Sequence, residues 1–391
     1  MFFCVTSKVH SSSPFDTSFD VPSMKFLLRR PTCSTPSMMF LLSADQNLLI
    51  EKKAKRAREL YFLGLFGNGR SLFHRIKSRY ALKKMTTAGM SESTMEMDPG
   101  AAFTLLLSCP DGLPRSRVYV DFGISYDRIP HPDTKLEESI NEIWTLQTEK
   151  NQSLYNGKKF RYGGHTLHHA DDADNKSSVC LHLGLTDYRT FVGTNLSPLW
   201  ENFLVPSKDD SIYCQHSASP LGNGAIVKTA DKRVLVLQRS LNVGEFPGYF
   251  VFPGGHSEPE EVGVLFHQMN KNSTEQEALN DKISQEMFEG IIREVVEEIG
   301  VPAESLSDPI FIGISRRNLN VRPTAFFFVN CSLKLDEIQQ LYSRAQDGYE
   351  STQLFDVSME ELLKMSERMP GCHRGGYALY ELMMKANHGD L

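Results

Sequence analysis

The chain has 391 residues, of which 40% are hydrophobic, so it can bury at least one large core and is long enough for two or three domains. Its net charge of −6 is uneven, because residues 1–90 hold 15 Lys and Arg against 5 Asp and Glu. Seven cysteines without a Cys-x-x-Cys pair argue against a disulfide framework or a zinc site, and no apolar run approaches the roughly 18 residues of a membrane helix. We therefore expect no membrane association.

Residues 1–97 are basic, Ser-rich and poor in acidic residues. This composition is typical of an organellar transit peptide, but it also fits a disordered or spurious extension that precedes a later translation start, for example at Met97. We favour the second interpretation and predict a cytoplasmic protein, with a plastid or a mitochondrion as the alternative location. The basic runs lack interleaved aromatic residues, so we expect no binding to nucleic acid.

Residues 98–206 are predicted to form a small α/β domain. Two strand-like runs, 101–109 and 115–124, flank a turn that contains Pro and Gly. Residues 131–151 have apolar side chains at helical spacing, and Asp133 is a suitable helix N-cap. A strand, a polar turn and a second strand complete the predicted domain.

Residues 219–391 are predicted to form a second, larger domain. It opens with a hairpin of two β-branched runs around the turn Ala-Asp-Lys at 230–232. A strand then enters the glycine turn Pro-Gly-Gly at 253–255. A long polar stretch, an acidic helix, two further strands and three helices follow. This alternation of strands and helices indicates an α/β fold.

The stretch IIREVVEEIGV, 291–301, places three glutamates on one face of a predicted helix. Glu294, Glu297 and Glu298 are three and four residues apart, and aliphatic residues line the opposite face. Like charges at this spacing repel each other by roughly 0.2–0.5 kcal/mol per pair, and an acidic helix face is most often simply solvated. The upstream Pro-Gly-Gly turn and the preceding Arg293 favour another interpretation. A hard divalent cation that prefers oxygen ligands, Mg²⁺ or alternatively Mn²⁺, offsets the repulsion.

The same residues resemble the Nudix box, G-x5-E-x7-R-E-U-x-E-E-x-G-U, in which U is aliphatic. Residues 293–301 match its second half at every fixed position, and Gly255 to Glu261 match its first half. In this chain 31 residues separate Glu261 from Arg293, where the family has seven, so the box at 255–301 carries an apparent insertion of 24 residues at about 262–285. The insertion is polar and has no strong periodic pattern, and we expect a surface loop.

Further stretches, among them YRTFVGTNLS and GISRRN, resemble the UDP-glucose pyrophosphatases of this family, which have an extra N-terminal domain and an expanded box. The resemblance implies a Nudix α/β/α sandwich with a mixed sheet, preceded by the smaller α/β domain. It also implies Mg²⁺-dependent hydrolysis of the nucleotide sugars UDP-glucose and UDP-galactose to UMP and a sugar 1-phosphate. The alternatives are a diphosphatase for ADP-ribose, ADP-sugars or dinucleotides, and a catalytically weak module that binds nucleotides. The oligomeric state stays open.

The resemblance also assigns roles within the box. Arg293 is expected to orient the site by pairing with Glu261 rather than to react. The carbonyl of Gly255 is a candidate metal ligand, and the general base stays open among the acids of the helix and residues outside the box. The acids that are expected to bind the metal are Glu294, Glu297 and Glu298.

Residues outside the box are candidates for substrate contacts. One arginine ends a strand at a point where many Nudix enzymes bind phosphate. A loop after another strand offers two more arginines, of which only one need face the site. An aromatic side chain can stack on uracil and an Asn can pair with its polar edge, although both types also pack domain boundaries. These candidates are Arg239, Arg316, Arg317, Asn318, Tyr188 and Asn195.

Overall fold

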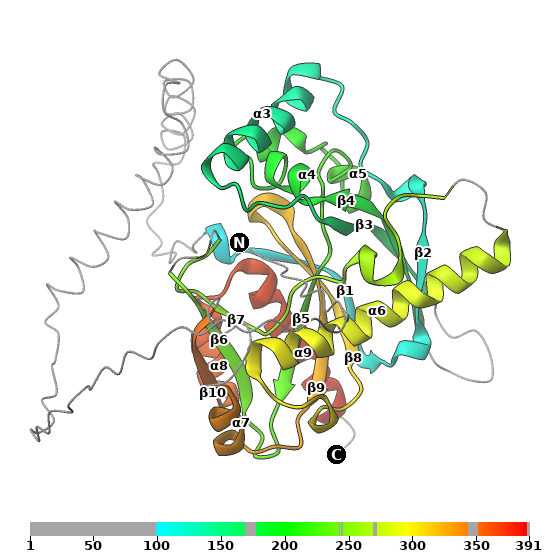
Figure 1. The fold of residues 1–391 in the computed structure, drawn as a ribbon. Coiled ribbons are helices and arrows are strands. Elements are labelled where there is room, and N and C mark those ends of the chain that lie inside the picture. The colour runs from blue at the N-terminus through cyan, green and yellow to red at the C-terminus, as the bar shows by residue number, and fades with distance from the viewer. Residues whose placement is uncertain are drawn as a thin grey trace, which may run out of the picture. The chain divides into compact units, whose positions relative to one another are not determined.

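A computed structural model describes residues 99–168, 177–241, 243, 245–268, 272–342 and 351–388 (Figure 1). The predicted leader, with its transit peptide and translation start, lies outside the described residues. The described residues form two β-sheets surrounded by helices. Within them, no helix has both the length and the apolar character needed to cross a membrane.

The larger sheet is mixed, as the sequence predicted. Its strand order is β1-β8-β9-β5-β6-β10, and β7 pairs with β6. Strands β5 and β9 are parallel, whereas the other neighbours are antiparallel. The strands are β1 (Phe103–Leu113), β5 (Gly222–Lys228), β6 (Val234–Arg239), β7 (Phe250–Val251), β8 (Ile310–Arg317), β9 (Pro323–Asn330) and β10 (Ser351–Val357).

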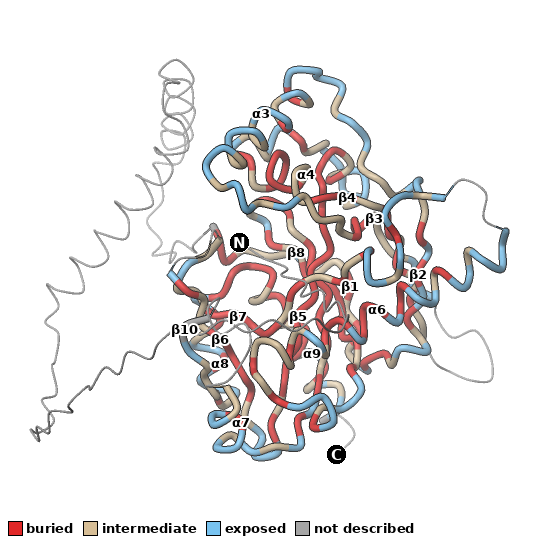
Figure 2. The backbone as a smooth tube through the Cα atoms, in the orientation of Figure 1, coloured by how far each residue is buried: buried red, intermediate tan, exposed pale blue. Residues whose placement is uncertain are grey.

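Helices cover both faces of this sheet. Helix α6 (Ser273–Ile299) packs on one face and helix α9 (Gly371–His388) on the other. Because strand side chains alternate between faces, Ala225 and Val227 of β5 share a core with α6, while Ile226 between them shares a core with α9. The buried backbone in Figure 2 accordingly runs through the middle of the molecule. The predicted α/β/α sandwich is confirmed.

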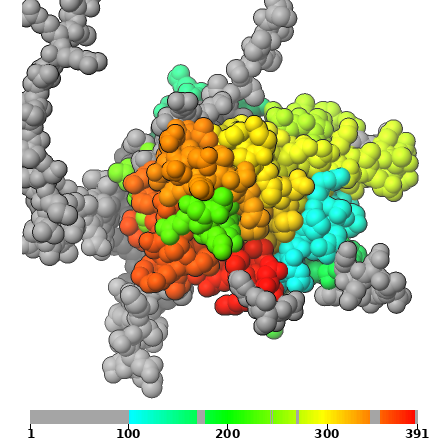
Figure 3. All heavy atoms as spheres, turned by 90° about the horizontal axis from the view of Figure 1, so that it is seen from below, coloured from blue at the N-terminus to red at the C-terminus, as the bar shows by residue number. Residues whose placement is uncertain are grey.

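The ends of the chain's described part meet on the larger sheet. Helix α9 packs against β1 and β8, and Figure 3 shows the cyan N-terminal segment beside the red C-terminal helix. Two short helices, α7 (Leu335–Tyr342) and α8 (Met359–Ser366), lie near β10 at the opposite edge. The 3-10 helices are η1 (Pro99–Ala101), η2 (Arg115–Arg117), η3 (Ile124–Tyr126), η4 (Trp200–Phe203), η5 (Pro259–Val262), η6 (Ala303–Ser305) and η7 (Leu319–Val321).

The smaller sheet belongs to the predicted N-terminal domain. Its order is β2-β4-β3, and of the helices from the same part of the chain only α3 is long. The side chain of Asp133 accepts a hydrogen bond from the backbone N–H of Lys135, which confirms the predicted helix start. Strand β1, although it comes from the same part of the sequence, pairs with β8 in the larger sheet. The elements are β2 (Val118–Phe122), β3 (Lys158–His168), β4 (Ser178–Asp187), α3 (Thr134–Lys150), α4 (Tyr188–Gly193) and α5 (Asp210–Tyr213).

The insertion in the box is mostly helical, so the predicted surface loop is wrong from residue 273 onward. Helix α6 begins at a capping box formed by Asn272 and Glu275, and its first half lies along β2. Ser284 Oγ donates to the carbonyl of Val118 at 2.7 Å, and Gln276 Nε2 donates to the carbonyl of Phe122 at 2.8 Å. The inserted residues therefore extend the box helix until it joins the two sheets.

Candidate active site

The acid helix of the sequence analysis is the C-terminal third of α6. Ile291, Val295 and Ile299 are fully buried against the larger sheet, while the glutamates between them are partly exposed on the other side. This is the amphipathic arrangement that the spacing predicted. Because the buried face fixes the rotation of the helix, it also fixes the direction in which Glu294, Glu297 and Glu298 project.

The glycine loop lies directly on this acid face. The backbone N–H of Gly254 donates to Oε2 of Glu298 at 2.8 Å, and the backbone N–H of His256 donates to Oε1 of Glu294 at 3.3 Å. On its other side the loop is tied to β5, since the N–H of Asn223 donates to the carbonyl of Gly255 at 2.9 Å. The two halves of the box, far apart in sequence, are therefore neighbours in space, as predicted.

Gly255 is required by this close approach. A Cβ atom at this position would lie 1.9 Å from Oε1 of Glu294, so any other residue here would displace this carboxylate from the loop. The carbonyl of Gly255 accepts a hydrogen bond from β5, so one of its two lone pairs is engaged. Its predicted contribution to a metal shell stays a prediction.

The acid face includes a carboxyl group with a strongly shifted pKa. The pKa of Glu294 is raised to about 7, chiefly by burial and also by the charges of Glu297 and Glu258. The hydrogen bond from His256 and the positive charge of Lys159 act in the opposite direction without cancelling this effect. The ionised form of Glu294 is therefore disfavoured, chiefly because the carboxyl group is removed from water.

The donor chemistry of the acid face fits Mg²⁺ or Mn²⁺. Carboxylate oxygens are the preferred ligands of such hard cations, and a bound cation lowers the pKa of nearby carboxyl groups. No group of three or more His, Cys, Asp or Glu side chains among the described residues is arranged to hold a metal ion by itself. Mg²⁺ is commonly held by one or two carboxylates together with water and substrate phosphates, which is compatible with this arrangement.

Arg293 pairs with Glu286, and the predicted pair with Glu261 is wrong. Nη2 of Arg293 lies 2.6 Å from Oε1 of Glu286, two helical turns earlier on α6. Among the ion pairs of the described residues, none joins Arg293 to Glu261. Burial lowers the pKa of Arg293, but the hydrogen bond and charge of Glu286 raise it, as does the charge of Glu261. Glu261 is thus near enough to act through its charge.

Three arginines converge on one residue, Glu245, beside the glycine loop. Nη2 of Arg317 lies 2.5 Å from Oε1 of Glu245, and Nη1 of Arg322 lies 3.3 Å from Oε2 of the same side chain. Nε of Arg239 donates to the backbone carbonyl of Glu245 at 3.0 Å. We call Arg239, Arg317 and Arg322 the arginine cluster.

The arginine cluster has an excess of positive charge. Burial raises the pKa of Glu245, but the charges of the arginines outweigh burial and hold this pKa at about 2. Burial and the nearby arginines hold the pKa of His256 and of His373 well below the usual range, so both rings are neutral. Two guanidinium groups therefore contact a single carboxylate and a third acts on it through its charge, so the surplus positive charge favours an anion.

Arg316 and Arg317 end β8 rather than follow it, and the two residues that flank Arg317 have other partners. Arg316 forms an ion pair with Asp210 and lies over the ring of Tyr213, 5.1 Å from its centroid. Oδ1 of Asn318 accepts a hydrogen bond from Oγ1 of Thr104 at 2.9 Å. Of the two adjacent arginines, Arg317 is therefore the one that joins the cluster.

Asn195 supports the arginine cluster from the N-terminal part of the chain. Its side chain accepts from the N–H of Ser219 at 3.1 Å and donates to the carbonyl of Asn320 at 2.8 Å. Oδ1 of Asn320 in turn accepts from Nε of Arg317 at 2.5 Å. The amide of Asn195 is buried and engaged by the protein, so this geometry favours packing over contact with a base.

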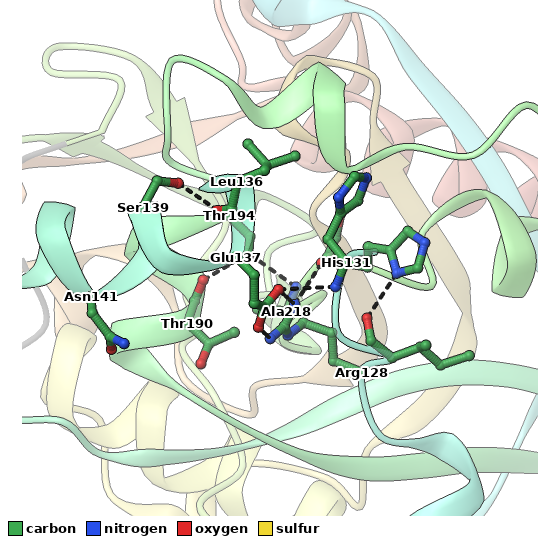
Figure 4. Close-up of polar contacts among 12 residues, drawn as sticks. Arg128, His131, Leu136, Glu137, Ser139, Asn141, Thr190, Thr194 and Ala218 are labelled. Carbon is green, nitrogen blue, oxygen red and sulfur yellow. Dashed lines mark hydrogen bonds and ion pairs between the residues drawn. The ribbon is translucent and has the colours of Figure 1, made fainter. Parts of the chain in front are cut away.

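The segment around α4 is itself firmly anchored (Figure 4). Oγ1 of Thr194 donates to the carbonyl of Thr190 at 2.7 Å and accepts from the N–H of Ala218 at 3.1 Å. In the same view Arg128 and Glu137 form an ion pair that holds α3 beside this segment. Tyr188 is the first residue of α4, and its ring packs edge-on against Trp144 at a centroid distance of 5.9 Å. The ring of Phe191, in the same helix, lies 5.6 Å from the guanidinium carbon of Arg322.

Several residues of the site escaped the sequence analysis. Glu245 and Arg322 come from connecting segments without periodic patterns, and Glu286 lies between the insertion and Arg293, where the box specifies no residue type. Lys159 comes from β3 of the smaller sheet, where its Nζ lies 2.9 Å from Oε1 of Glu258 in the glycine loop. Their common signal is a charge at a buried or partly buried position, which only the fold reveals.

Comparison with known proteins defines the class. No protein-family model matches the chain. It is 60% identical to Nudix hydrolase 9 of Arabidopsis thaliana over 298 residues, which are 76% of this chain and 96% of that protein. The chain therefore belongs to the Nudix hydrolases.

Two further comparisons are more distant. The chain is 33% identical to the human uridine diphosphate glucose pyrophosphatase NUDT22 over 281 residues, 69% of this chain and 87% of that protein. A solved structure, that of the MutT protein from Methanosarcina mazei, covers 43% of this chain and 94% of its own, with 20% identity and a TM-score of 0.28.

Proposed function

We propose that this Nudix hydrolase cleaves the diphosphate bond of UDP-sugars, with UDP-glucose and UDP-galactose as substrates, to give UMP and a sugar 1-phosphate. The observation that carries the proposal is the contact between the two charged halves of the site. Nη2 of Arg322 lies 3.1 Å from Nε2 of His256, and the N–H of His256 donates to Glu294. A diphosphate needs cationic groups and a metal ion close together, and this arrangement places guanidinium groups near carboxylates that would hold such an ion. The human relative named as a UDP-glucose pyrophosphatase supports the choice of substrate.

Each half of the site has its own task in this reaction. The guanidinium groups of the arginine cluster bind phosphate oxygens, for which their planar forks are well suited. Glu294 and Glu298, with Glu297 beside them, hold Mg²⁺. When bound, this ion neutralises the diphosphate and stabilises the charge of the transition state.

The chemistry is a substitution at phosphorus by water. The water oxygen forms a bond to one phosphorus of the diphosphate, the bond from that phosphorus to the bridging oxygen breaks, and the bridging oxygen leaves on the other phosphate. The proton of the water passes to a carboxylate of the acid face or to a residue outside the box. The Gly254 and His256 N–H groups hold the Glu298 and Glu294 carboxylates in place for this purpose.

A substrate panel tests the proposal. Full-length protein is incubated with UDP-glucose, UDP-galactose, ADP-ribose, ADP-glucose, diadenosine polyphosphates and NADH, with and without Mg²⁺ or Mn²⁺, and the products are identified by mass spectrometry. We expect UMP and sugar 1-phosphate from the UDP-sugars, only with metal. Turnover confined to adenine compounds would refute the substrate assignment, and nucleotide binding without any turnover would refute the enzymatic one. Reaction in ¹⁸O-labelled water shows which phosphorus is attacked.

A further inference from the structure

The ion pair between Glu286 and Arg293 has unusual surroundings for a helix surface. The side chain of Glu286 is 5% exposed, whereas the side chain of its partner Arg293 is 44% exposed. A buried carboxylate costs desolvation free energy, so it is stable only with good partners. Glu286 is the first of the seven residues between the apparent insertion and Arg293, where the box specifies no residue type.

The helix is shaped to allow this pair. Residues 286, 290 and 293 are spaced by four and three positions, so they follow one another along one face of α6. The middle position is Gly290, where a Cβ atom would lie 3.1 Å from Oε1 of Glu286 and 3.5 Å from Nη2 of Arg293. The absence of a side chain at Gly290 thus leaves the space through which Arg293 reaches Glu286.

The same carboxylate faces the glycine loop. The backbone N–H of Glu258 points to Oε1 of Glu286 at a distance of 3.5 Å, and the side chain of Glu258 is held by Lys159 of the smaller sheet. Glu261, in contrast, is exposed on η5. Its charge raises the pKa of Glu286, after the larger effect of burial, and so disfavours the ionised form that the pair with Arg293 needs.

We propose that Glu286, and not Glu261, is the positioning residue that fixes Arg293 and the glycine loop for the reaction. The inference rests on the proposed hydrolase function, because it assigns a role within that site. With Glu286 in place, the loop N–H groups that hold Glu294 and Glu298 keep their position relative to α6. Without its charge, Arg293 is released and the loop loses one of its contacts with the helix.

The test compares Glu286→Gln with Glu261→Gln in the full-length protein, with Glu289→Gln as a matched control on an exposed face of the same helix. The substrate is whichever diphosphate the panel identifies, at saturating metal and well below the unfolding temperature. We expect Glu286→Gln to lower kcat by about 30-fold or more with a KM within about threefold of wild type, since a displaced loop affects the transition state more than substrate binding. The other two variants should stay within about twofold.

A second readout does not depend on turnover. Hydrogen exchange of peptides that cover 253–262 should become at least about fivefold faster in Glu286→Gln and stay unchanged in Glu261→Gln. The double variant Glu286→Gln with Arg293→Gln should be no worse than the poorer single variant, because both remove the same pair. The inference would be overturned if Glu286→Gln had the kcat and the hydrogen-exchange rates of wild type. A larger loss of kcat in Glu261→Gln than in Glu286→Gln would also overturn it. If wild-type protein has no substrate in the panel, the proposed function fails, while the exchange result still decides the role of Glu286.

Discussion

Nη2 of Arg322 lies 3.1 Å from Nε2 of His256, and this contact joins the cationic and anionic halves of the site. The His256 ring is neutral, so it accepts a hydrogen bond from the guanidinium group without adding charge. Its backbone N–H faces Glu294 on α6 at 3.3 Å. One residue of the glycine loop therefore keeps the arginine cluster and the acid face close enough to act on the same diphosphate.

The acid face is tested most directly by Glu298→Gln. The amide oxygen of Gln can still accept the hydrogen bond from the N–H of Gly254, which is 2.8 Å from the carboxylate in the native protein. The negative charge that a metal ion needs is lost. We expect kcat to fall by about 100-fold or more, while the thermal unfolding temperature changes by no more than about 2 °C. Turnover equal to wild type at saturating Mg²⁺ would exclude Glu298 as a metal ligand.

The arginine cluster makes a prediction that separates two adjacent residues. Arg317→Lys keeps the charge but removes the planar fork that contacts Glu245 and Asn320, so kcat/KM for the substrate should fall by roughly 10- to 100-fold. Arg316→Lys is the control, because Arg316 pairs with Asp210 outside the cluster and should change kcat/KM by less than about threefold. Steady-state kinetics on both variants decides the matter, and equal losses would mean that the cluster does not bind substrate.

Glu245 gives a prediction about pH and stability. Its pKa is about 2 in the folded protein, below the ordinary value of 4.5, so the ionised carboxylate stabilises the fold above pH 4.5 and this stabilisation is lost as pH falls toward 2. The shift corresponds to about 3 kcal/mol. Glu245→Gln should therefore be less stable than wild type near neutral pH, and the difference should shrink between pH 4.5 and pH 2.

Urea unfolding at a series of pH values measures this difference. Exposed Glu304→Gln serves as the control, and its stability should follow that of wild type over the whole range. A stability difference for Glu245→Gln that does not depend on pH would mean that the variant acts through packing rather than through the charge of the carboxylate.

The parts of the site that the sequence predicted are those with a local pattern. The acid face of α6 follows from helical spacing, and the adjacency of Gly255 and Glu294 follows from the motif. The first half of α6 was not predicted, because the apolar residues that hold it are few and contact β2, more than 150 residues earlier in the chain. Leu279 and Ile283 look isolated in a polar sequence until β2 is beside them.

Charge pairs between distant segments were equally inaccessible. Glu245 and Arg322 have no neighbours of recognisable pattern, and their contact depends on the order of β6, β8 and β9 in the sheet. The motif led to one wrong prediction. Matching Glu261 to the box predicts that Glu261 pairs with Arg293, but in the structure Arg293 pairs with Glu286. Helix α6 is longer than the family pattern predicts, and the partner of Arg293 therefore lies on α6 itself.

The first half of α6 leads to a last prediction about the insertion. Ile283 is fully buried in the core that also contains Val118 and Val120 of β2. Ile283→Ala removes this contact and leaves a cavity, so we expect a loss of about 2–4 kcal/mol in the free energy of unfolding. Lys282→Ala, one residue earlier and exposed, should change it by less than about 0.5 kcal/mol.

Urea unfolding of the two variants separates a docked helix from a surface loop. In a loop both substitutions would be tolerated equally, and equal stabilities would contradict the docking of α6 on β2. If the prediction holds, deletion of residues 265–282 should also be poorly tolerated, because it removes Gln276 and Leu279 from the contact with the smaller sheet. The inserted residues then stabilise the helix that carries the acids, and the length of the box is part of how this chain joins its two sheets around one site.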